Sequence, residues 1–286
     1  MRVWCSVVLL VLLAVEHGVA SAQGDAKRGA YLAKAAGCVG CHTEAKQSAV
    51  PYAGGRALKT PFGTFYGPNI TPHPSAGLGR WSEADFLRAM RLGLRPDGAH
   101  YFPAFPYPSF TRINDADLRD LWSYLRTLPP SARPSQTHDL RFPFGWRFLV
   151  VGWKWLFFTP GAFSADAKRT PLLERGAYLV EALGHCAECH TPRNFLGGLK
   201  RDRWLAGTAK GPDGDPVPNL TPARLKKWSD GELKDFLQTG MTPDGDVAAE
   251  SMGEVIRNTT GELTPPDLAA MIAYLRALAP IADEPK

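Results

Sequence analysis

The sequence lacks three features, each of which would point to a different class of protein. A helix needs about 20 apolar residues to cross a bilayer, and the apolar stretch over residues 3–15 is shorter than that. The 33 lysines and arginines are scattered among 28 acidic residues, and the lack of a basic stripe argues against nucleic acid as a partner. No alternation of apolar and polar residues lasts long enough to indicate a sheet, so we predict an all-α fold.

The first 22 residues have the pattern of a secretory signal peptide. Arg2 precedes the apolar stretch, and Ala20-Ser21-Ala22 is a small-residue motif of the kind at which such signals are cleaved. We expect cleavage after Ala22 and export to the periplasm. A retained membrane anchor is the alternative, which the short stretch disfavours.

An internal repeat divides the remaining chain into two copies. The matched segments are residues 28–32 with 175–179, 68–72 with 218–222, Trp81 with Trp228, and 93–98 with 240–245. About 260 residues suit two domains of roughly 100–200 residues each. We predict one domain over residues 23–135, a second over residues 171–282, and a linker over residues 136–170.

Helix signals recur within each copy. Ser229 with Glu232, and Thr264 with Asp267, have the spacing of a capping box, in which side chains satisfy amides of the first helical turn. Apolar residues then repeat at helical spacing in both closing helices. They are Leu118, Leu121, Trp122 and Leu125 in the first copy, and Leu268, Met271, Ile272 and Leu275 in the second. Each copy is predicted to have a first helix, a long loop with one short helix, and a closing helix.

Gly29 and Gly176 lie inside the predicted first helices, where glycine costs about 1 kcal/mol relative to alanine. We predict that the closing helix approaches closely at both points, with Tyr124 and Tyr274 over the gap. The alternative is that both glycines are simply tolerated.

An aromatic stretch over residues 142–158 separates the copies and is interrupted by Arg147 and Lys154. These charges argue against a membrane span. We interpret the stretch as a linker packed in the groove between the domains. Peripheral membrane contact and partner docking are the alternatives.

Two segments of the form Cys-x-x-Cys-His are c-type haem attachment motifs. Their residues are Cys38, Cys41 and His42 in the first, and Cys186, Cys189 and His190 in the second. Two cysteines three residues apart on a helical turn each form a thioether with one haem, and the adjacent histidine turns onto the iron. A zinc knuckle, a redox pair or a disulfide is the alternative, which the matched positions of both motifs in a duplicated, exported chain disfavour. We therefore predict two covalently bound haem c groups.

Methionine is a common sixth ligand of iron in cytochromes c, where its thioether raises the reduction potential. Met252 follows the second motif by a long loop and precedes the closing helix, which is the expected place. Met241 stands at a helix end and Met271 on the apolar face of the closing helix. We predict Met252 as the distal ligand of the second haem.

The first copy has Phe105 in register with Met252, and phenylalanine does not bind iron. We expect either His100 as the distal ligand, if its loop folds differently from its counterpart, or an open or water-bound site. His73 and Met90 are further alternatives. Without a thioether the first haem has the lower potential, which predicts electron flow from the first haem to the second.

Asn69 and Asn219 begin matched loop segments, where they either donate to a haem propionate or cap a turn. Trp81 and Trp228 either line the haem crevices or serve core packing alone.

These motifs resemble the cytochrome c subunits of periplasmic alcohol, gluconate and molybdenum-hydroxylase dehydrogenases. The resemblance covers nearly the whole mature chain. It is carried by the two attachment motifs and by residues 68–71, 103–107, 152–154 and 190–194. It implies two tandem class I cytochrome c domains, a periplasmic dehydrogenase as electron donor, and another cytochrome, quinone or an oxidase as acceptor.

The resemblance favours a two-haem electron relay with no substrate chemistry of its own. The alternative is a dihaem enzyme, of the peroxidase or thiosulfate dehydrogenase type, that works at an open first haem. Such chemistry needs a vacant iron position with a nearby acid, base or thiolate, and none is evident around Phe105. A docking subunit that uses residues 142–158 is a third hypothesis, compatible with the relay.

Overall fold

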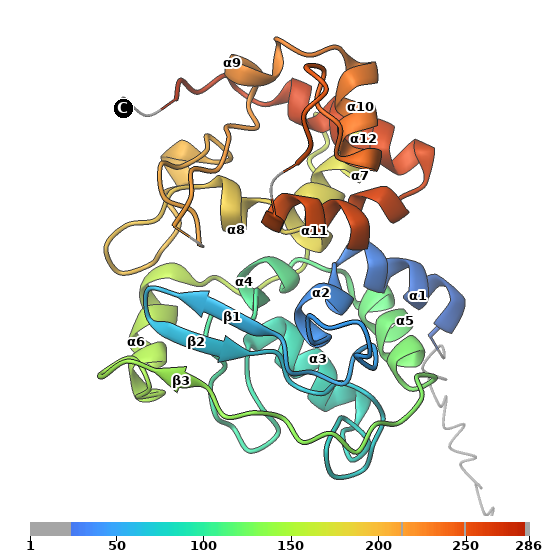
Figure 1. The fold of residues 1–286 in the computed structure, drawn as a ribbon, viewed down its shortest axis with the longest axis vertical. Coiled ribbons are helices and arrows are strands. Elements are labelled where there is room, and N and C mark those ends of the chain that lie inside the picture. Colours follow the sequence, from blue (N-terminus) through green and yellow to red (C-terminus); the bar gives the residue numbers. More distant parts are fainter. Residues whose placement is uncertain (1–23, 213, 249, 284–286) are drawn as a thin grey trace, which may run out of the picture.

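Helices dominate both copies of the repeat in the computed structural model, which describes residues 24–212, 214–248 and 250–283 (Figure 1). The predicted signal peptide and its cleavage site after Ala22 lie outside the described residues. The first copy contains α1 (Ala26–Ala35), α2 (Cys38–His42), α3 (Glu83–Leu92), α4 (Tyr107–Phe110) and α5 (Asp115–Leu125). The second contains α7 (Pro171–Tyr178), the π-helical turn η1 (Leu179–Leu183), α8 (Ala187–His190), the 3-10 turn η2 (Arg201–Arg203), α9 (Pro222–Leu225), α10 (Asp230–Thr239), α11 (Glu250–Asn258), the 3-10 turn η3 (Thr260–Glu262) and α12 (Pro265–Ala277).

The predicted capping signals begin two helices of the second copy. At α10 the box is complete, because Ser229 accepts from the Glu232 amide and the Glu232 carboxylate accepts from Ser229. At α12 only half of the box forms. Thr264 accepts from the Asp267 amide, but the Asp267 carboxylate is bound by Arg175. A contact with another helix therefore replaces the local one.

The first and closing helices of each copy touch at the predicted glycines, which confirms the close approach. A Cβ atom on Gly29 would lie 1.9 Å from the backbone oxygen of Asp120 on α5. A Cβ atom on Gly176 would lie 2.0 Å from that of Ala270 on α12. The tyrosines beside the two glycines are Tyr124 and Tyr274. Only glycine permits helices to pack at this distance.

A small antiparallel sheet departs from the predicted all-α fold. Strand β1 (Ala57–Thr60) pairs with β2 (Gly63–Tyr66), which pairs with β3 (Asp139–Leu140). The prediction of no sheet was wrong here, because strands of four, four and two residues are too short to show an alternating pattern. Gly63 turns the chain between β1 and β2 with φ of +122°, a conformation that glycine adopts readily. The fold is otherwise mostly helical.

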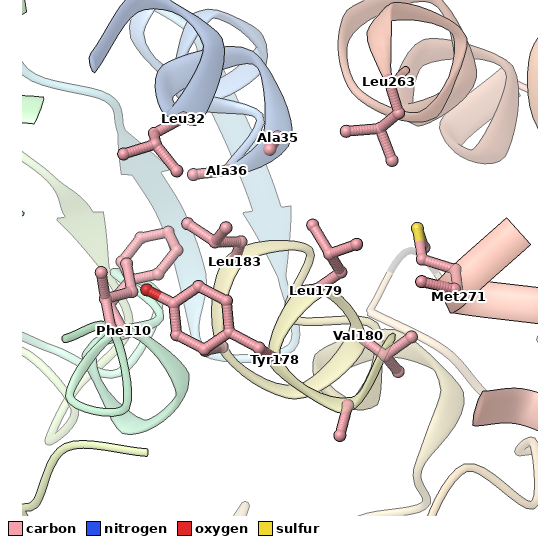
Figure 2. Close-up of a cluster of buried hydrophobic side chains, with 14 of the residues drawn as sticks. Leu32, Ala35, Ala36, Phe110, Tyr178, Leu179, Val180, Leu183, Leu263 and Met271 are labelled. Atoms are coloured by element: carbon pink, nitrogen blue, oxygen red, sulfur yellow. The ribbon is translucent and has the colours of Figure 1, made fainter. Parts of the chain in front are cut away.

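One hydrophobic core extends through both copies (Figure 2). Leu32 and Ala36 from the end of α1 and Phe110 from α4 face Tyr178 and Leu183 of the second copy. All five side chains are buried. The two copies are therefore joined by a packed interface, and their attachment motifs border it.

Helix α6 (Phe148–Phe157) forms within the aromatic stretch and contacts both copies. Nζ of Lys154 donates to two backbone carbonyls at the end of α3, 2.6 and 2.9 Å away. Nε1 of Trp153 donates to the Leu196 carbonyl of the second copy at 3.0 Å. The inner face of α6 thus contacts both domains.

The same region carries exposed apolar side chains, several of which line the cavity beside the attachment motifs. These side chains, which we call the aromatic surface, are Phe142, Phe144, Trp146, Phe148, Leu149, Val151, Trp155, Leu156, Phe195 and Leu196. Trp155 is 86% exposed and Phe195 92% exposed, so groove packing accounts for only part of the stretch. None of the helices in the described part of the chain has the length and apolar character needed to traverse a bilayer.

Candidate haem-attachment sites

The first attachment motif is the short helix α2, which follows Gly37 directly. Gly37 has φ of +61°, and this left-handed residue separates α1 from α2. Cys38 and Cys41 are three residues apart on α2 and therefore share one of its faces. Burial, and after it the neighbouring Cys41, raises the pKa of the Cys38 thiol to about 12. In the described structure neither cysteine forms a disulfide.

The second motif is reached through η1 and through Gly184 and His185, with α8 beginning inside the motif. Burial, and then Cys189, raises the pKa of the Cys186 thiol to about 12. Both motifs thus place a protonated, half-buried thiol beside a short helix.

The same hydrogen bond orients both motif histidines. Nδ1 of His42 lies 2.7 Å from the Pro68 carbonyl oxygen, and Nδ1 of His190 lies 2.7 Å from that of Pro218. Because a carbonyl only accepts, Nδ1 carries the proton and Nε2 keeps its lone pair for a metal ion. Burial lowers the pKa of both rings and favours the neutral form that binds metals. The repeated loop segments that begin at these prolines therefore position the histidines.

This arrangement fits covalently bound haem. Each motif offers two thiols and one neutral imidazole, which a hydrogen bond holds at Nδ1 and leaves free at Nε2. A cavity of about 1760 Å³ is lined by both motifs, at Cys41 and at Cys189. That volume exceeds the roughly 300–1,000 Å³ of an ordinary ligand pocket. Aromatic side chains such as Phe65, Phe102 and Trp146 line it further and make it largely apolar.

The three methionines of the second domain differ in their surroundings. Met241 is 56% exposed, and Met271 is buried in the core on α12. Met252 lies near the start of α11, half-buried against the core. Its role as the distal ligand of the second haem stays a prediction. The two other methionines lie at the surface (Met241) and in the core (Met271).

The backbone at His100 itself is arranged as in the second copy. His100 forms an isolated β-bridge with Leu94, and Val247 forms the matching bridge with Met241 in the second copy. Nδ1 of His100 is buried and has no hydrogen-bond partner among the described residues. Burial, and then the charge of Lys154, lowers the pKa of this ring. The proline-rich loop after His100 does differ from its counterpart, since it leads to the short helix α4 where the second copy has the longer α11, and His100 as the distal iron ligand stays a prediction.

The other candidates of the first domain also have structural roles. Met90 is buried in the core on α3, and Nδ1 of His73 accepts from the Ala76 amide at 3.1 Å within a turn. Phe105 is surrounded by aromatic rings. These rings belong to Tyr101, Tyr107 and Phe110. The distal ligand of the first haem stays a prediction, with His100 and an open or water-bound site as the alternatives.

Asn69 and Asn219 bind backbone within their own domains. Nδ2 of Asn69 donates to the carbonyls of Ser131 and Arg133, each at 2.8 Å. Its Oδ1 accepts from the amide of Thr71 at 2.9 Å. Nδ2 of Asn219 donates in the same way to the segment after α12. These contacts support the turn-capping alternative, and they leave neither hydrogen of Asn69 for a propionate.

Trp81 and Trp228 are half-buried against the shared core. The ring of Trp228 also meets that of Phe236 edge-on, with centroids 5.2 Å apart. Core packing accounts for both side chains, and a place in the haem crevices stays a prediction.

Sequence reasoning missed the ion pairs between the first and closing helices. Arg28 on α1 binds Asp117 on α5, and Arg175 on α7 binds Asp267 on α12 at 2.7 Å. The signal was present, because both arginines open the repeated segment of residues 28–32 and 175–179.

Two helical copies, each with paired thiols and an oriented neutral imidazole, define a protein with two covalent haem sites. The profile of the cytochrome c family matches residues 26–129 and 173–279. The chain belongs to the cytochrome c family, and its cofactors are two covalently bound haem c groups.

Several curated relatives are similar over most of the chain. A protein named diheme cytochrome c-type from Cereibacter sphaeroides is 44% identical over 92% of this chain and 88% of its own length. A subunit of the nicotinate dehydrogenase of Pseudomonas putida is 43% identical over 88% of this chain, which spans 21% of that protein. The cytochrome c subunit of the quinone-dependent alcohol dehydrogenase of Gluconobacter oxydans is 34% identical over 98% of this chain, which spans 61% of that subunit.

Proposed function

We propose that this protein is a dihaem electron relay between a periplasmic dehydrogenase and a respiratory acceptor, which is another cytochrome, quinone or an oxidase. The observation that carries the proposal is that both attachment motifs line one cavity between two duplicated domains. Two adjacent redox sites suit the passage of single electrons. The relatives named as cytochrome subunits of alcohol, gluconate and fructose dehydrogenases support a dehydrogenase as donor.

The chain holds the cofactors with a small set of side chains. Haem c supplies one-electron iron chemistry at each site when bound. Cys38, Cys41, Cys186 and Cys189 are the covalent attachment points, His42 and His190 are the proximal ligands, and Met252 is the distal ligand of the second site. The largely apolar lining of the cavity lowers the polarity around a bound haem, which helps to set its potential.

The proposed relay is exported after cleavage behind Ala22 and works in the periplasm. Its first domain spans residues 23–135 and its second residues 171–282, with the linker of residues 136–170 between them. Strand β3 ties the start of this linker to the first domain.

The aromatic surface is the proposed contact for the dehydrogenase. Its exposed side chains gather from the linker and from the loop at Phe195, which Trp153 holds against α6 through the Leu196 carbonyl. Exposed apolar patches of this kind mark interaction sites. A variant with Trp155→Ser and Phe148→Ser, neither of which lines the cavity, is expected to lose the partner on size-exclusion chromatography. Unchanged partner binding, with loss of sedimentation on vesicles of anionic phospholipid, would assign the surface to a membrane instead.

A dihaem oxidoreductase is the second candidate, and the placement of Phe105 favours it. An aromatic side chain in register with Met252 is what an open first haem would have. Carbon monoxide binding to the ferrous protein, together with peroxide or thiosulfate turnover, would support this function. Carbon monoxide binding without turnover would leave the relay as the better account.

The relay is tested directly in cells that contain the protein. Membranes from these cells are expected to reduce the cytochrome, seen as the sharp ferrous haem absorption, when ethanol, gluconate, fructose or nicotinate is added. Cells without the chain are expected to lose oxygen uptake with the same substrate. A cytochrome that stays oxidised with every substrate, and respiration that does not change, would contradict the proposal.

A further inference from the structure

The two copies differ by one residue just before the attachment motif. Tyr178 follows Tyr31 by 147 positions, whereas Cys186 follows Cys38 by 148. The second copy thus contains an extra residue between its first helix and its motif. The turn η1 absorbs this residue, since a π-helical turn holds more residues than an α-helical one. Such turns are frequent at functional sites.

His185 occupies the position next to the motif that this insertion creates. Its φ of +39° lies in the left-handed region, which a non-glycine residue keeps only when its surroundings hold it there. The matching position before the first motif is Gly37, which adopts φ of +61° without strain. A strained histidine thus stands where the first copy has a relaxed glycine.

The side chain of His185 reaches across the domain interface. Its ring meets the ring of Phe110 on α4 edge-on, with centroids 5.3 Å apart and an interplanar angle of 77°. His185 therefore connects the second motif, which it directly precedes in the chain, with α4 of the first domain.

A second contact from inside the same motif reaches the same helix. Oγ of Ser109 on α4 donates to Oε1 of Glu188 at 2.8 Å. Arg193 holds the other carboxylate oxygen of Glu188 at 2.5 Å. The second attachment motif is thus fastened to α4 at two points three residues apart, His185 and Glu188.

We propose that His185 and Glu188 form a clamp that fixes the second attachment motif against the first domain and thereby sets the interaction between the two haem sites. Both act as positioning residues, since neither is an attachment or iron-binding residue. The inference rests on the proposed relay, because only a protein that passes electrons between its sites needs them held at a constant distance.

Three variants of the holoprotein test the clamp. His185→Gly removes the ring and relieves the strained φ, while Ser109→Ala breaks the second contact from the first domain without altering the motif. His138→Phe is the matched control. His138 also packs edge-on against a phenylalanine, Phe65, and accepts a backbone hydrogen bond, but these contacts lie within the first domain and do not join it to the second.

Hydrogen–deuterium exchange by mass spectrometry reports on the clamp without any enzyme assay. In His185→Gly and in Ser109→Ala, we expect exchange to rise about fivefold or more in α4 and α8 together, the lower end of coupling effects between sites. We expect the potential of each haem to depend less on the oxidation state of the other in a potentiometric titration. His185→Gly is further expected to keep or raise the thermal midpoint, because the strain is gone, a result that a merely structural role would not give.

The outcomes separate the clamp from the relay. Exchange that changes only in the turn of the substituted residue, or a titration identical to that of the wild type, would overturn the clamp even in a protein that carries two haems and relays electrons. Absence of haem from the wild-type protein would instead overturn the proposed function.

Discussion

Tyr178 of the second domain donates its hydroxyl to Asp117 of the first at 2.6 Å, and Tyr31 of the first domain donates in turn to Asp267 of the second at 2.5 Å. The two tyrosines occupy the same position in the repeat. Each hydroxyl also accepts the backbone amide at the start of the other domain's closing helix, at 3.2 Å in both cases. Each domain therefore caps a helix of the other, and this explains the incomplete capping box at α12.

Removal of one of these tyrosine hydroxyls weakens the domain interface. Tyr178→Phe leaves Asp117 paired with Arg28 but takes away a hydrogen bond to a charged group, worth about 1.5–3 kcal/mol. We expect the free energy of unfolding in urea to fall by about 2 kcal/mol. Together with Tyr31→Phe, we expect the single transition to divide into two. Tyr66→Phe in β2, away from the interface, serves as the control, and equal stability of all four proteins would contradict the mutual capping.

Acid weakens the same interface through Asp267. Burial alone would raise the pKa of this carboxyl, but the hydrogen bonds from Arg175 and Tyr31 and the charge of Arg175 outweigh it and hold the pKa below 3.8. The group thus stabilises the fold above pH 3.8, and this contribution is lost as the pH falls through the lower folded pKa. We expect the stability difference between the wild type and Asp267→Asn to shrink between about pH 5 and pH 3. A difference that stays constant over this range would contradict the assignment.

Gly176 is predicted to tolerate no side chain. A Cβ atom there would lie 2.0 Å from the backbone oxygen of Ala270, so Gly176→Ala pushes α7 and α12 apart and costs about 3 kcal/mol, as overpacking does at its upper range. Gly231→Ala in α10 is the matched control, because its nearest neighbouring atom is 3.9 Å from the added carbon. We expect this control to stabilise the protein by up to about 1 kcal/mol. Thermal unfolding measures the stability of both variants, and an equal change in stability would refute the close approach.

The first haem is predicted to have the lower reduction potential, because no thioether stands at Phe105. Phe105→Met is expected to raise that potential by more than about 59 mV, which is a tenfold change in a one-electron equilibrium. Met252→Ala is expected to lower the potential of the second haem. Potentiometric titration with electron paramagnetic resonance at each step follows both sites. A first haem that is the more oxidising of the two would reject the predicted direction of flow.

Most of the fold could be predicted from local sequence patterns. The repeat located the first and closing helices of both copies, the spacing at Ser229 predicted a capping box, and the buried glycines predicted a close helix pair, which the structure confirms. These signals are contained in short segments. The prediction of one short helix in the long loop was wrong, because α3 and α4 lie there in the first copy and α9, α10 and α11 in the second. The small sheet was not predicted, because its strands are too short to form an alternating pattern and β3 comes from a distant part of the chain.

The attachment motifs could likewise be predicted from the sequence, because the spacing of the two cysteines and the histidine is what allows them to hold one haem. Contacts between distant segments were not. Nothing local shows that His185 lies against Phe110, or that the Asn69 amide is bound by the segment that follows α5. A one-residue difference between the copies was nevertheless readable at Cys186, and it marks the place where the second site departs from the first.

The central claim is that iron porphyrin is attached to this chain at two places. Intact-protein mass spectrometry of the mature protein, produced in a host competent in haem attachment, measures it most directly. The account predicts the mass of residues 23–286 plus two haems, falling to one haem when Cys186 and Cys189 are both replaced by alanine. A wild-type mass equal to that of the bare polypeptide, or to that of the polypeptide with a single haem, would contradict it.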